Sequence, residues 1–356
     1  MDTFKNLEID PQITQILGDF NLPDELGFGT VMSPIMIEMD YADGKWGQMK
    51  LIPYRQLTLD PTAKVLHYGQ EIFEGMKAYR ANGNGPFLFR PLENIKRFNL
   101  SAKRMAMPEV DEELALEGLR AMVSFSKDLI PIQSEASLYI RPFMIATDIH
   151  LGMKPSETFK FMIVASPSQA YFKSDSVKVW IETDNIRAAE GGIGAAKTGG
   201  NYAASLLAMI AAKEKGYDQV LWLDAKNKVN IEEMSGMNFF AVYENNVIKT
   251  PKLTQTILHG VTRKSVIELA KHKGYQVEET SISYLELLKD IQSGKCTECF
   301  ACGTAVIITP IKSLASESTT AQLANDYGNI TKELRQELLD LQEGRSEDPF
   351  GWRLSV

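Results

Sequence analysis

The sequence predicts a mixed α/β fold divided into two domains, and three observations support this prediction. The chain has 356 residues, more than one hydrophobic core usually serves. Its composition, with 44% hydrophobic and 24% charged residues, is that of an ordinary soluble globular protein. Strand-like apolar runs occur along the whole chain, with helical patterns between them. We expect a smaller N-terminal domain over residues 1–167, an interdomain linker over 168–182, and a larger C-terminal domain over 183–356.

The first half of the chain alternates strands with turns and contains two helices. Strands are expected at Gln48–Pro53, Gly75–Arg80, Phe87–Phe89, Ser137–Ile145 and Phe159–Ala165. The Asn-Gly pairs at 82–85 lie between apolar residues and indicate a hairpin. Helices are expected over 92–105 and 111–129, and the second begins at Asp111 with carboxylates in its first turn. The turn-rich Ser166–Gln169 lacks an apolar pattern, so we expect the linker to begin in this segment.

Helices and short strands alternate in the second half. Small residues on one face predict a helix over Asn201–Lys215, which Gly216 ends. Two strands, Met237–Tyr243 and Val247–Thr250, are expected to pair as a hairpin across Glu244–Asn246. The remaining elements are a buried strand at Gln219–Leu223 and helices over Val261–Lys273, Tyr284–Gln292 and Thr331–Gln342.

Charge and apolar patterning argue against two classes of partner. The formal net charge is −8 and no run rich in Lys or Arg occurs, which argues against nucleic acid. The N-terminus lacks a basic region followed by an apolar run, and no apolar stretch is long enough to span a bilayer. We therefore expect a cytoplasmic protein that has no membrane partner.

Three cysteines follow one another at a CxxCxxC spacing, which raises the question of a metal or redox site. They are Cys296, Cys299 and Cys302. A closed zinc site needs four ligands, and none of the four histidines lies nearby in the sequence. The segment Cys299–Ile308 instead resembles a strand with a glycine break, where free cysteine is a common small buried hydrophobe. We expect no metal here.

The most distinctive stretch of the chain is a glycine-rich run around one lysine. Five of the ten residues from 191 to 200 are glycine, Lys197 lies among them, and Tyr202 follows five residues later. Glycines allow the backbone to approach a ligand closely. A lysine in such a loop suits Schiff-base chemistry with an aldehyde cofactor, whereas the alternative is a mobile loop with a chance lysine.

An ordered set of motifs resembles one family, the branched-chain amino acid aminotransferases of the fold-type IV class of pyridoxal-phosphate enzymes. In chain order the set comprises His67–Tyr68, Phe73–Ala78, Phe89–Pro91 with Arg97, Ser137–Pro142, Gly199–Tyr202, Val220–Leu223, Glu233 with Met237–Asn238, Leu258 with Gly260–Val261, and Gly303–Ala305. The resemblance covers the chain from about Phe28 to the C-terminus and is greatest to the larger, eukaryotic-like subgroup.

The resemblance implies a fold, an activity and an assembly. The fold would have two domains with the active site at their interface. The activity would be reversible transamination of L-leucine, L-isoleucine and L-valine with 2-oxoglutarate and glutamate (EC 2.6.1.42), a ping-pong reaction through a Schiff base on Lys197. Leu151–Met153 resembles a loop that closes over the site of the partner subunit, which implies a homodimer.

The resemblance also assigns residues to the cofactor, pyridoxal 5'-phosphate. Lys197 would form the Schiff base and act as general acid and base. Glu233 would hold the pyridine nitrogen protonated, with the neighbouring Glu232 as the alternative, and Tyr202 would bind the phenolate oxygen. The phosphate would be held by residues that offer a guanidinium, a hydroxyl or backbone N–H groups, namely Arg97 (with Arg90 and Arg104 as alternatives), Gly260, Val261, Thr262, Gly303 and Thr304.

A pocket for the substrate is implied in the same way. Its apolar and aromatic wall would be Phe28, Phe73, Tyr139, Tyr171 and Leu258, with Leu151 and Met153 from the closing loop. Tyr68, Thr304 and Ala305 would hold the α-carboxylate. Arg141 lies two residues from Tyr139 on one predicted strand, so both side chains share a face. Its guanidinium could meet the carboxylate of glutamate or order the polar rim of the pocket.

Two departures and two rival families qualify the resemblance. Cys302 stands where other members often carry serine, and Val306 and Thr309 stand where vertebrate members carry a redox-sensing CxxC, so we expect no thiol switch of that kind.

D-amino acid aminotransferase and the lyase that forms 4-aminobenzoate share the fold. Both tend to be shorter and lack the Phe73–Lys77 stretch.

Overall fold

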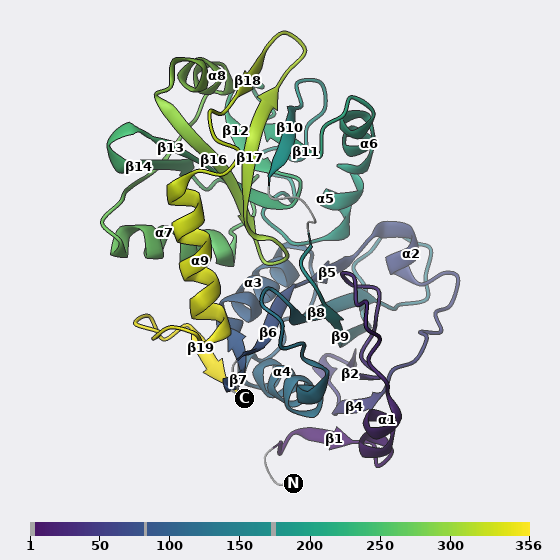
Figure 1. Ribbon diagram of the computed structural model, residues 1–356. Coiled ribbons are helices and arrows are strands. Elements are labelled where there is room, and N and C mark those ends of the chain that lie inside the picture. The colour runs from purple at the N-terminus through teal and green to yellow at the C-terminus, as the bar shows by residue number, and fades with distance from the viewer. Residues whose placement is uncertain (1–3, 82–83, 172–175) are drawn as a thin grey trace. The chain divides into compact units, whose positions relative to one another are not determined.

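The computed structural model describes residues 4–81, 84–171 and 176–356, which form two compact units. The first unit contains the described residues up to Tyr171 together with Ala196–Gly199 and Asp340–Val356. The second contains the described residues from 176 to Ala195 and Gly200–Leu339. Each unit has its own β-sheet with helices packed against it, as the mixed α/β prediction required (Figure 1).

Ten strands of the described chain form the sheet of the first unit, in the order β1-β4-β2-β9-β8-β6-β7-β19, with β3 beside β2 and β5 beside β8. These strands are β1 (Leu7–Ile9), β2 (Ile35–Ala42), β3 (Lys45–Trp46), β4 (Met49–Pro53), β5 (Glu71–Phe73), β6 (Met76–Ala81), β7 (Asn84–Phe89), β8 (Ser137–Ala146), β9 (Phe159–Ser168) and β19 (Arg353–Ser355). The helical elements are α1 (Ile13–Asp19), α2 (Lys64–Tyr68), α3 (Pro91–Arg104), α4 (Glu112–Phe125) and the short 3₁₀ helix η1 (Lys127–Leu129). The predicted hairpin is present as β6 and β7, although residues 82–83 of its turn lie outside the described residues.

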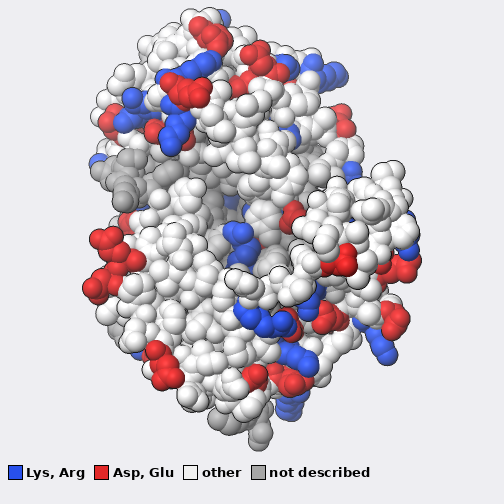
Figure 2. All heavy atoms as spheres, turned by 90° about the vertical axis from the view of Figure 1, so that its right-hand side faces the viewer, with Lys and Arg blue, Asp and Glu red and all other residues white. Residues whose placement is uncertain are grey.

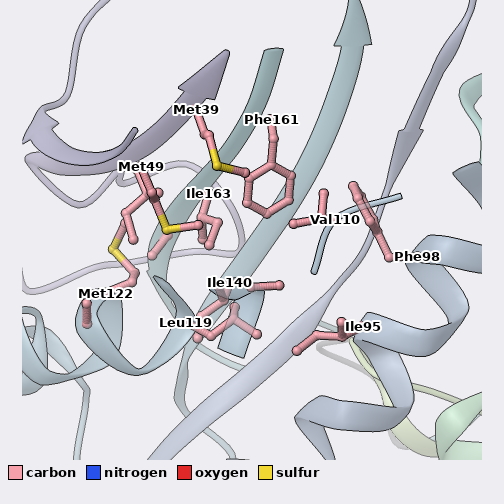
Figure 3. Close-up of a cluster of buried hydrophobic side chains, with 14 of the residues drawn as sticks. Met39, Met49, Ile95, Phe98, Val110, Leu119, Met122, Ile140, Phe161 and Ile163 are labelled. Carbon is pink, nitrogen blue, oxygen red and sulfur yellow. The ribbon is translucent and has the colours of Figure 1, made fainter. Parts of the chain in front are cut away.

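Helices α3 and α4 cover one face of this sheet and enclose its hydrophobic core (Figure 3). The Asp111 side chain caps α4 by accepting a hydrogen bond of 2.9 Å from the Leu114 N–H. The helix then buries Leu119 and Met122 at helical spacing against the sheet. A Cβ atom at Gly118 would lie 2.8 Å from Met49 Sδ, so glycine permits the close approach of helix to strand.

The sheet of the second unit closes on itself. Its nine strands run in the order β12-β11-β10-β17-β16-β13-β14-β15 among the described residues, with β18 beside β17, and β12 also pairs with β13. They are β10 (Val177–Ile181), β11 (Gln219–Leu223), β12 (Ile231–Met234), β13 (Met237–Tyr243), β14 (Val247–Pro251), β15 (Gln276–Thr280), β16 (Cys296–Gly303), β17 (Ile307–Ala315) and β18 (Thr320–Gln322). The helical elements are α6 (Leu206–Glu214), η2 (Glu244–Asn246), α7 (Val261–His272) and α8 (Tyr284–Ser293). Two more helices, α5 (Gly199–Ala203) and α9 (Asn329–Glu343), belong to this unit except for Gly199 and Asp340–Glu343.

Strand β11 shows why these strands are apolar on both faces. Leu221 and Leu223 face the main core of the second unit, while Val220 and Trp222 pack with Ala208 and other small residues of α6. All five residues of β11 are therefore buried. The predicted strand and the small-residue face of the preceding helix therefore form one contact.

The structure differs from the sequence expectations at several places. The helix expected over 201–215 is broken between α5 and α6. The turn expected at Ser166–Gln169 is wrong up to Ser168, because β9 continues there in pairing with β8. Within the expected linker, Val177–Ile181 forms β10, a buried strand between β11 and β17, whereas residues 172–175 lie outside the described residues. The expected domain limits stay a prediction.

Candidate active site

Lys197 is held by its backbone between two elements of the first unit. Its N–H donates a hydrogen bond of 2.9 Å to Ser101 Oγ on α3, and its carbonyl accepts one of 3.0 Å from the Phe73 N–H at the end of β5. Its ammonium lies 4.8 Å from the centre of the Phe73 ring. The predicted nucleophile is thus a half-buried lysine whose backbone N–H and carbonyl are both hydrogen-bonded.

A buried ion pair lies beside this lysine. Glu74 is fully buried and Arg97 is 7% exposed. Arg97 binds both carboxylate oxygens of Glu74, with Nε 2.7 Å from Oε1 and Nη2 2.8 Å from Oε2. Burial opposes ionisation of Glu74, but Arg97, together with Lys197 and Asn94, outweighs it and holds the pKa of this carboxyl below its ordinary value.

Of the three candidate phosphate arginines, Arg97 binds the carboxylate on which the charge of Lys197 also acts. The Arg90 guanidinium instead lies 4.8 Å from the centre of the Trp352 ring, and Arg104 is exposed at the end of α3. The sequence assigned no role to Glu74, although it is the second residue of the Phe73–Ala78 motif. Its place as the one acidic residue of that motif was the only signal available for it.

A second carboxylate, Glu71, fixes the chain just after Lys197. Its Oε1 accepts a hydrogen bond from the Gly199 N–H and another of 3.3 Å from Thr198 Oγ1. Burial raises the pKa of Glu71, while these hydrogen bonds and the charge of Arg141 oppose the rise. Sequence reasoning missed this residue because it precedes the motif and carries no distinctive spacing.

The aromatic residues predicted to form the substrate wall do lie together in the first unit. The Phe28 ring lies 5.0 Å from that of Tyr139 and 4.9 Å from that of Tyr171, both edge to face. Arg141 donates a hydrogen bond of 3.1 Å to the Tyr139 hydroxyl, and its guanidinium lies 4.8 Å from the centre of the Phe73 ring. A cation is therefore built into an aromatic cluster.

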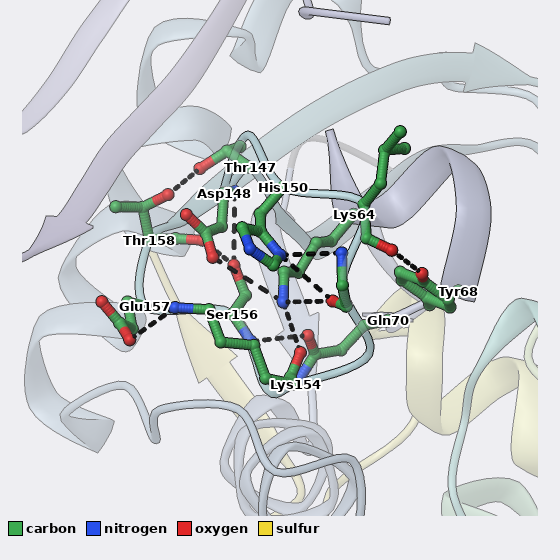
Figure 4. Close-up of polar contacts among 12 residues, drawn as sticks. Lys64, Tyr68, Gln70, Thr147, Asp148, His150, Lys154, Ser156, Glu157 and Thr158 are labelled. Atoms are coloured by element: carbon green, nitrogen blue, oxygen red, sulfur yellow. Dashed lines mark hydrogen bonds and ion pairs between the residues drawn. The ribbon is translucent and has the colours of Figure 1, made fainter. Parts of the chain in front are cut away.

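Three other predicted residues of the first unit, Tyr68, Leu151 and Met153, lie at its surface. Tyr68 is 43% exposed and its hydroxyl donates a hydrogen bond to the Leu151 carbonyl (Figure 4). The side chains of Leu151 and Met153 are 60% and 90% exposed. Tyr68 and the predicted closing loop thus form one structural element.

In the second unit, Glu233 occupies a buried polar site. It is 2% exposed, Oε1 lies 3.0 Å from Arg187 Nε, and Oε2 accepts a hydrogen bond of 2.8 Å from the Leu258 N–H. Glu233 pairs with Asn238 across the β12–β13 turn, and the Asn238 amide donates a hydrogen bond of 3.1 Å to the Leu258 carbonyl. Arg187 carried no sequence signal, since it lies in no recognised motif.

The neighbouring Glu232 has different partners. It accepts a hydrogen bond from the Thr256 hydroxyl through Oε1, and Oε2 has no hydrogen-bond partner among the described residues. Burial raises the pKa of Glu232 to about 7. Successive strand residues point to opposite faces, so the two glutamates lie on different sides of β12.

The predicted phosphate-binding residues of the second unit lie at turns that follow β-strands or begin a helix. Gly260 is the N-cap of α7, so the N–H groups of Val261 and Thr262 belong to the first turn of that helix, where N–H groups lack helical partners. A Cβ atom at Gly260 would clash with Asn238 Oδ1, next to Glu233. Thr304 and Ala305 form the turn between β16 and β17. Ile307, the first residue of β17, has a φ of 64°, which is a strained conformation for a β-branched residue.

Tyr202 lies near the same group of residues. A Cβ atom at Gly236 would lie 3.4 Å from Tyr202 Cε1, and Gly236 directly precedes β13. Tyr202, Glu233, Leu258 and Gly260 are therefore neighbours in the second unit. Lys197, Arg97 and the aromatic cluster belong to the first.

The cysteines form no cluster with other metal-binding side chains. Of the residues that the structure describes, no group of three or more His, Cys, Asp or Glu could hold a metal ion. All three thiols are free and buried in β16, with Cys296 Sγ 3.7 Å from Cys299 Sγ. Burial raises the pKa of Cys299 and Cys302 well above the ordinary value.

The molecular surface carries both signs of charge. On the face shown in Figure 2, lysine and arginine side chains are interspersed with aspartate and glutamate over the described residues. No helix in the described part of the chain is long and apolar enough to cross a membrane.

Taken unit by unit, the fold and these side chains define a mixed α/β enzyme whose candidate reactive group is a lysine amine. Residues 71–314 match the family described as amino-transferase class IV. The chain is 46% identical over 336 residues to a probable branched-chain-amino-acid aminotransferase of Staphylococcus epidermidis, covering 93% of each chain. It is 45% identical over 339 residues to branched-chain-amino-acid transaminase 1 of Bacillus subtilis, covering 94% of this chain and 95% of the relative.

Solved structures agree with the sequence matches. The branched-chain amino acid aminotransferase of Escherichia coli superimposes with a TM-score of 0.73 at 29% identity, covering 89% of this chain and 98% of that one. A second enzyme of the same name, solved with N-(5'-phosphopyridoxyl)-L-glutamate, gives a TM-score of 0.72 at 27% identity, with the same coverage. The chain therefore belongs to the class IV aminotransferases and, within them, to the branched-chain amino acid aminotransferases.

Proposed function

We propose that this protein catalyses reversible transamination of L-leucine, L-isoleucine and L-valine with 2-oxoglutarate and glutamate, using pyridoxal 5'-phosphate. The proposal is supported by the names of the relatives at 45% and 46% identity. Structures of the second solved enzyme contain N-(5'-phosphopyridoxyl)-L-glutamate, pyridoxamine 5'-phosphate or 4-methylvaleric acid. These ligands are a glutamate adduct, the aminated cofactor and a branched apolar acid.

The residues of the second unit fit this cofactor. The buried Glu233 carboxylate suits a protonated ring nitrogen, and the N-terminus of α7 suits a phosphate. Because a Cβ at Gly260 would collide with Asn238, only glycine keeps the backbone in place at this helix N-terminus. Gly260, Val261, Thr262, Gly303 and Thr304 would hold the phosphate with Arg97, and Tyr202 would bind the ring hydroxyl.

When bound, pyridoxal phosphate supplies an aldehyde carbon that accepts the amino group and a ring that withdraws electrons. Lys197 holds and moves the proton at the substrate α-carbon, acting as base and then as acid. The nearby Glu74 carboxylate and Phe73 ring both lie close to the Lys197 ammonium. Arg187 and the Leu258 N–H each bind one oxygen of the Glu233 carboxylate. They would keep this carboxylate oriented toward the ring nitrogen.

The single observation that best supports the dual substrate range is the position of Arg141. Its guanidinium lies among Phe73 and Tyr139, and Phe28 and Tyr171 extend the same cluster. Rings can pack against a branched side chain, while the cation binds the γ-carboxylate of glutamate in the same pocket. Tyr68, Thr304 and Ala305 would hold the α-carboxylate that both substrates share.

We propose further that the enzyme works in the cytoplasm as a homodimer. In the family resemblance, Leu151 and Met153 close over the pocket of the second subunit. Both apolar side chains are exposed in one chain, as side chains awaiting a partner surface would be.

The visible absorbance of the purified protein tests the proposal. Bound pyridoxal phosphate colours the wild type, L-leucine should remove the colour, and 2-oxoglutarate should restore it. Lys197→Ala should bind cofactor without this cycle. A response to D-alanine but not to L-leucine would favour the D-amino acid aminotransferase alternative, and near-normal turnover by Lys197→Ala would overturn the mechanism.

Two matched variants test which glutamate faces the cofactor. Glu233→Gln should keep cofactor bound but slow turnover by about two or more orders of magnitude, since a neutral partner no longer favours the protonated ring. Glu232→Gln, on the other side of β12, should retain most of the turnover. The reverse pattern would show that the assignment is wrong by one residue.

A further inference from the structure

The segment between β8 and β9 combines an apolar tip with a firmly held backbone. Ile149, Leu151 and Met153 are 64%, 60% and 90% exposed. Exposed apolar side chains on a loop usually cost solubility and are retained where a surface covers them. A loop that must present these side chains in one shape needs a fixed backbone.

One buried lysine supplies much of that fixation. Lys64 is 1% exposed, and its ammonium donates hydrogen bonds of 2.5 Å to the Lys154 carbonyl and 3.3 Å to the Gly152 carbonyl. The Asp148 carboxylate lies 3.7 Å away on its other side (Figure 4). Three oxygen groups of the loop therefore converge on a single cation.

Neutral hydrogen bonds complete the loop. The Gly152 N–H donates to His150 Nδ1 at 2.7 Å, and the Ser156 N–H donates to Gln70 Oε1 at 3.2 Å. Both are weaker than hydrogen bonds from an ammonium group. A buried charge that lost its partners would destabilise the fold, so the loop oxygens cannot leave Lys64 without a substantial penalty.

Helix α2 joins this anchor to a predicted substrate residue. Lys64 is its first residue and Tyr68 its last. The Tyr68 hydroxyl donates a hydrogen bond to the Leu151 carbonyl, so α2 binds the loop at both ends. Any movement of the loop tip must therefore also move Tyr68.

We propose that Lys64 is a positioning residue that sets the shape of the loop tip and of Tyr68 for the substrate pocket of a second copy of this chain. This inference rests on the proposed function, in which the tip closes that pocket. Lys64 itself touches loop oxygens and neither substrate nor cofactor. Its loss changes how well the pocket closes, not the chemistry at Lys197.

The chain offers a matched control for the loss of a lysine charge. The Lys154 side chain lies in the same loop but is 45% exposed and pairs with Glu157 at 2.9 Å on the surface. We expect Lys64→Met to raise the KM for L-leucine about tenfold, with a smaller change in kcat and unchanged cofactor absorbance. Lys154→Met should leave KM within about twofold of wild type.

A second variant covers the outcome in which Lys64→Met does not fold. Asp148→Asn keeps the shape of the loop but weakens its hold on the ammonium, and it should raise KM about threefold. Amide hydrogen exchange in residues 149–154 should become faster in both variants. Unchanged KM and unchanged exchange in Asp148→Asn and in any folded Lys64→Met would overturn the proposal.

Hybrid dimers decide which chain the loop serves. In a hybrid of wild type with a Lys64→Met, Lys197→Ala chain, the one working site faces the altered loop of its partner, and KM should rise. In a hybrid of Lys64→Met with Lys197→Ala, the working site faces an intact loop, and KM should be normal. If KM rises only in the second hybrid, the loop covers the pocket of its own chain and the proposal is overturned. If the wild type is inactive on L-leucine, the proposed function itself is overturned.

Discussion

Replacing Glu74 with glutamine should destabilise the first unit strongly, because it leaves the buried Arg97 cation without its counter-charge. Arg97 is 7% exposed and makes two hydrogen bonds, at 2.7 and 2.8 Å, to the Glu74 carboxylate. Removing one member of a buried ion pair typically costs about 3–5 kcal/mol. Glutamine still accepts one hydrogen bond, so we expect a loss of about 3 kcal/mol in the free energy of unfolding.

A surface pair provides the control for this measurement. Arg80 lies 3.2 Å from Asp128 in the same unit, with side chains that are 38% and 77% exposed. Asp128→Asn should cost less than about 1 kcal/mol. Urea unfolding followed by tryptophan fluorescence measures both variants, and equal losses for Glu74→Gln and Asp128→Asn would refute the reasoning.

The pH dependence of the Glu74 effect has a definite sign. The pKa of this carboxyl is lower in the folded state than its ordinary value of 4.5. Its contribution to stability is therefore complete above about pH 5 and is lost as the pH falls through the lower folded-state pKa. The stability difference between wild type and Glu74→Gln should shrink in acid and stay constant from neutral pH upwards.

Other parts of the molecule give three more testable expectations. The pKa of Glu232 is raised from 4.5 to about 7, so between these values the folded state holds a proton that the unfolded state releases. The wild type should therefore lose up to about 3 kcal/mol of stability between about pH 5 and 8. Glu232→Gln should not show this loss, and urea unfolding at each pH measures it. Gly260→Ala should weaken pyridoxal-phosphate binding at least about tenfold in an equilibrium titration, because its Cβ would displace Asn238; unchanged affinity would mean that this helix N-terminus does not hold the phosphate. The three buried thiols should react with a thiol reagent only after unfolding, and mild oxidant should cause no thiol-reversible loss of activity; rapid reaction of the native protein would contradict this.

Short-range chemistry made much of the fold predictable. Helix α4 follows from Asp111 as a cap and from apolar residues at helical spacing, and both features act within a few residues. The hairpin of β13 and β14 follows from two apolar runs around Glu244–Asn246. Strand β10 was missed because it is stabilised by β11 and β17, which lie far from it in the sequence. The length of β9 was missed for the same reason, since β8 extends it through Ser168.

Some residues of the candidate site could likewise be found from the sequence, and others could not. The glycine-rich run marked Lys197 from the sequence, because a lysine among glycines is unusual wherever it occurs. The ordered motifs supplied the positions of Glu233 and Arg97, but the roles of all three stay predictions. Arg187 and Lys64 carry no local signal, and the only signal for Glu74 is its place as an acidic residue within a motif.

By itself, therefore, the sequence determined the class of fold, the family and the candidate reactive lysine, since each of these is written in residue type and spacing along the chain. Tertiary structure alone decided which charges neutralise one another: Glu74 with Arg97, Glu233 with Arg187, and Lys64 with the oxygens of a distant loop. A buried charge must have a partner, and the partner is chosen by distance in space rather than along the sequence.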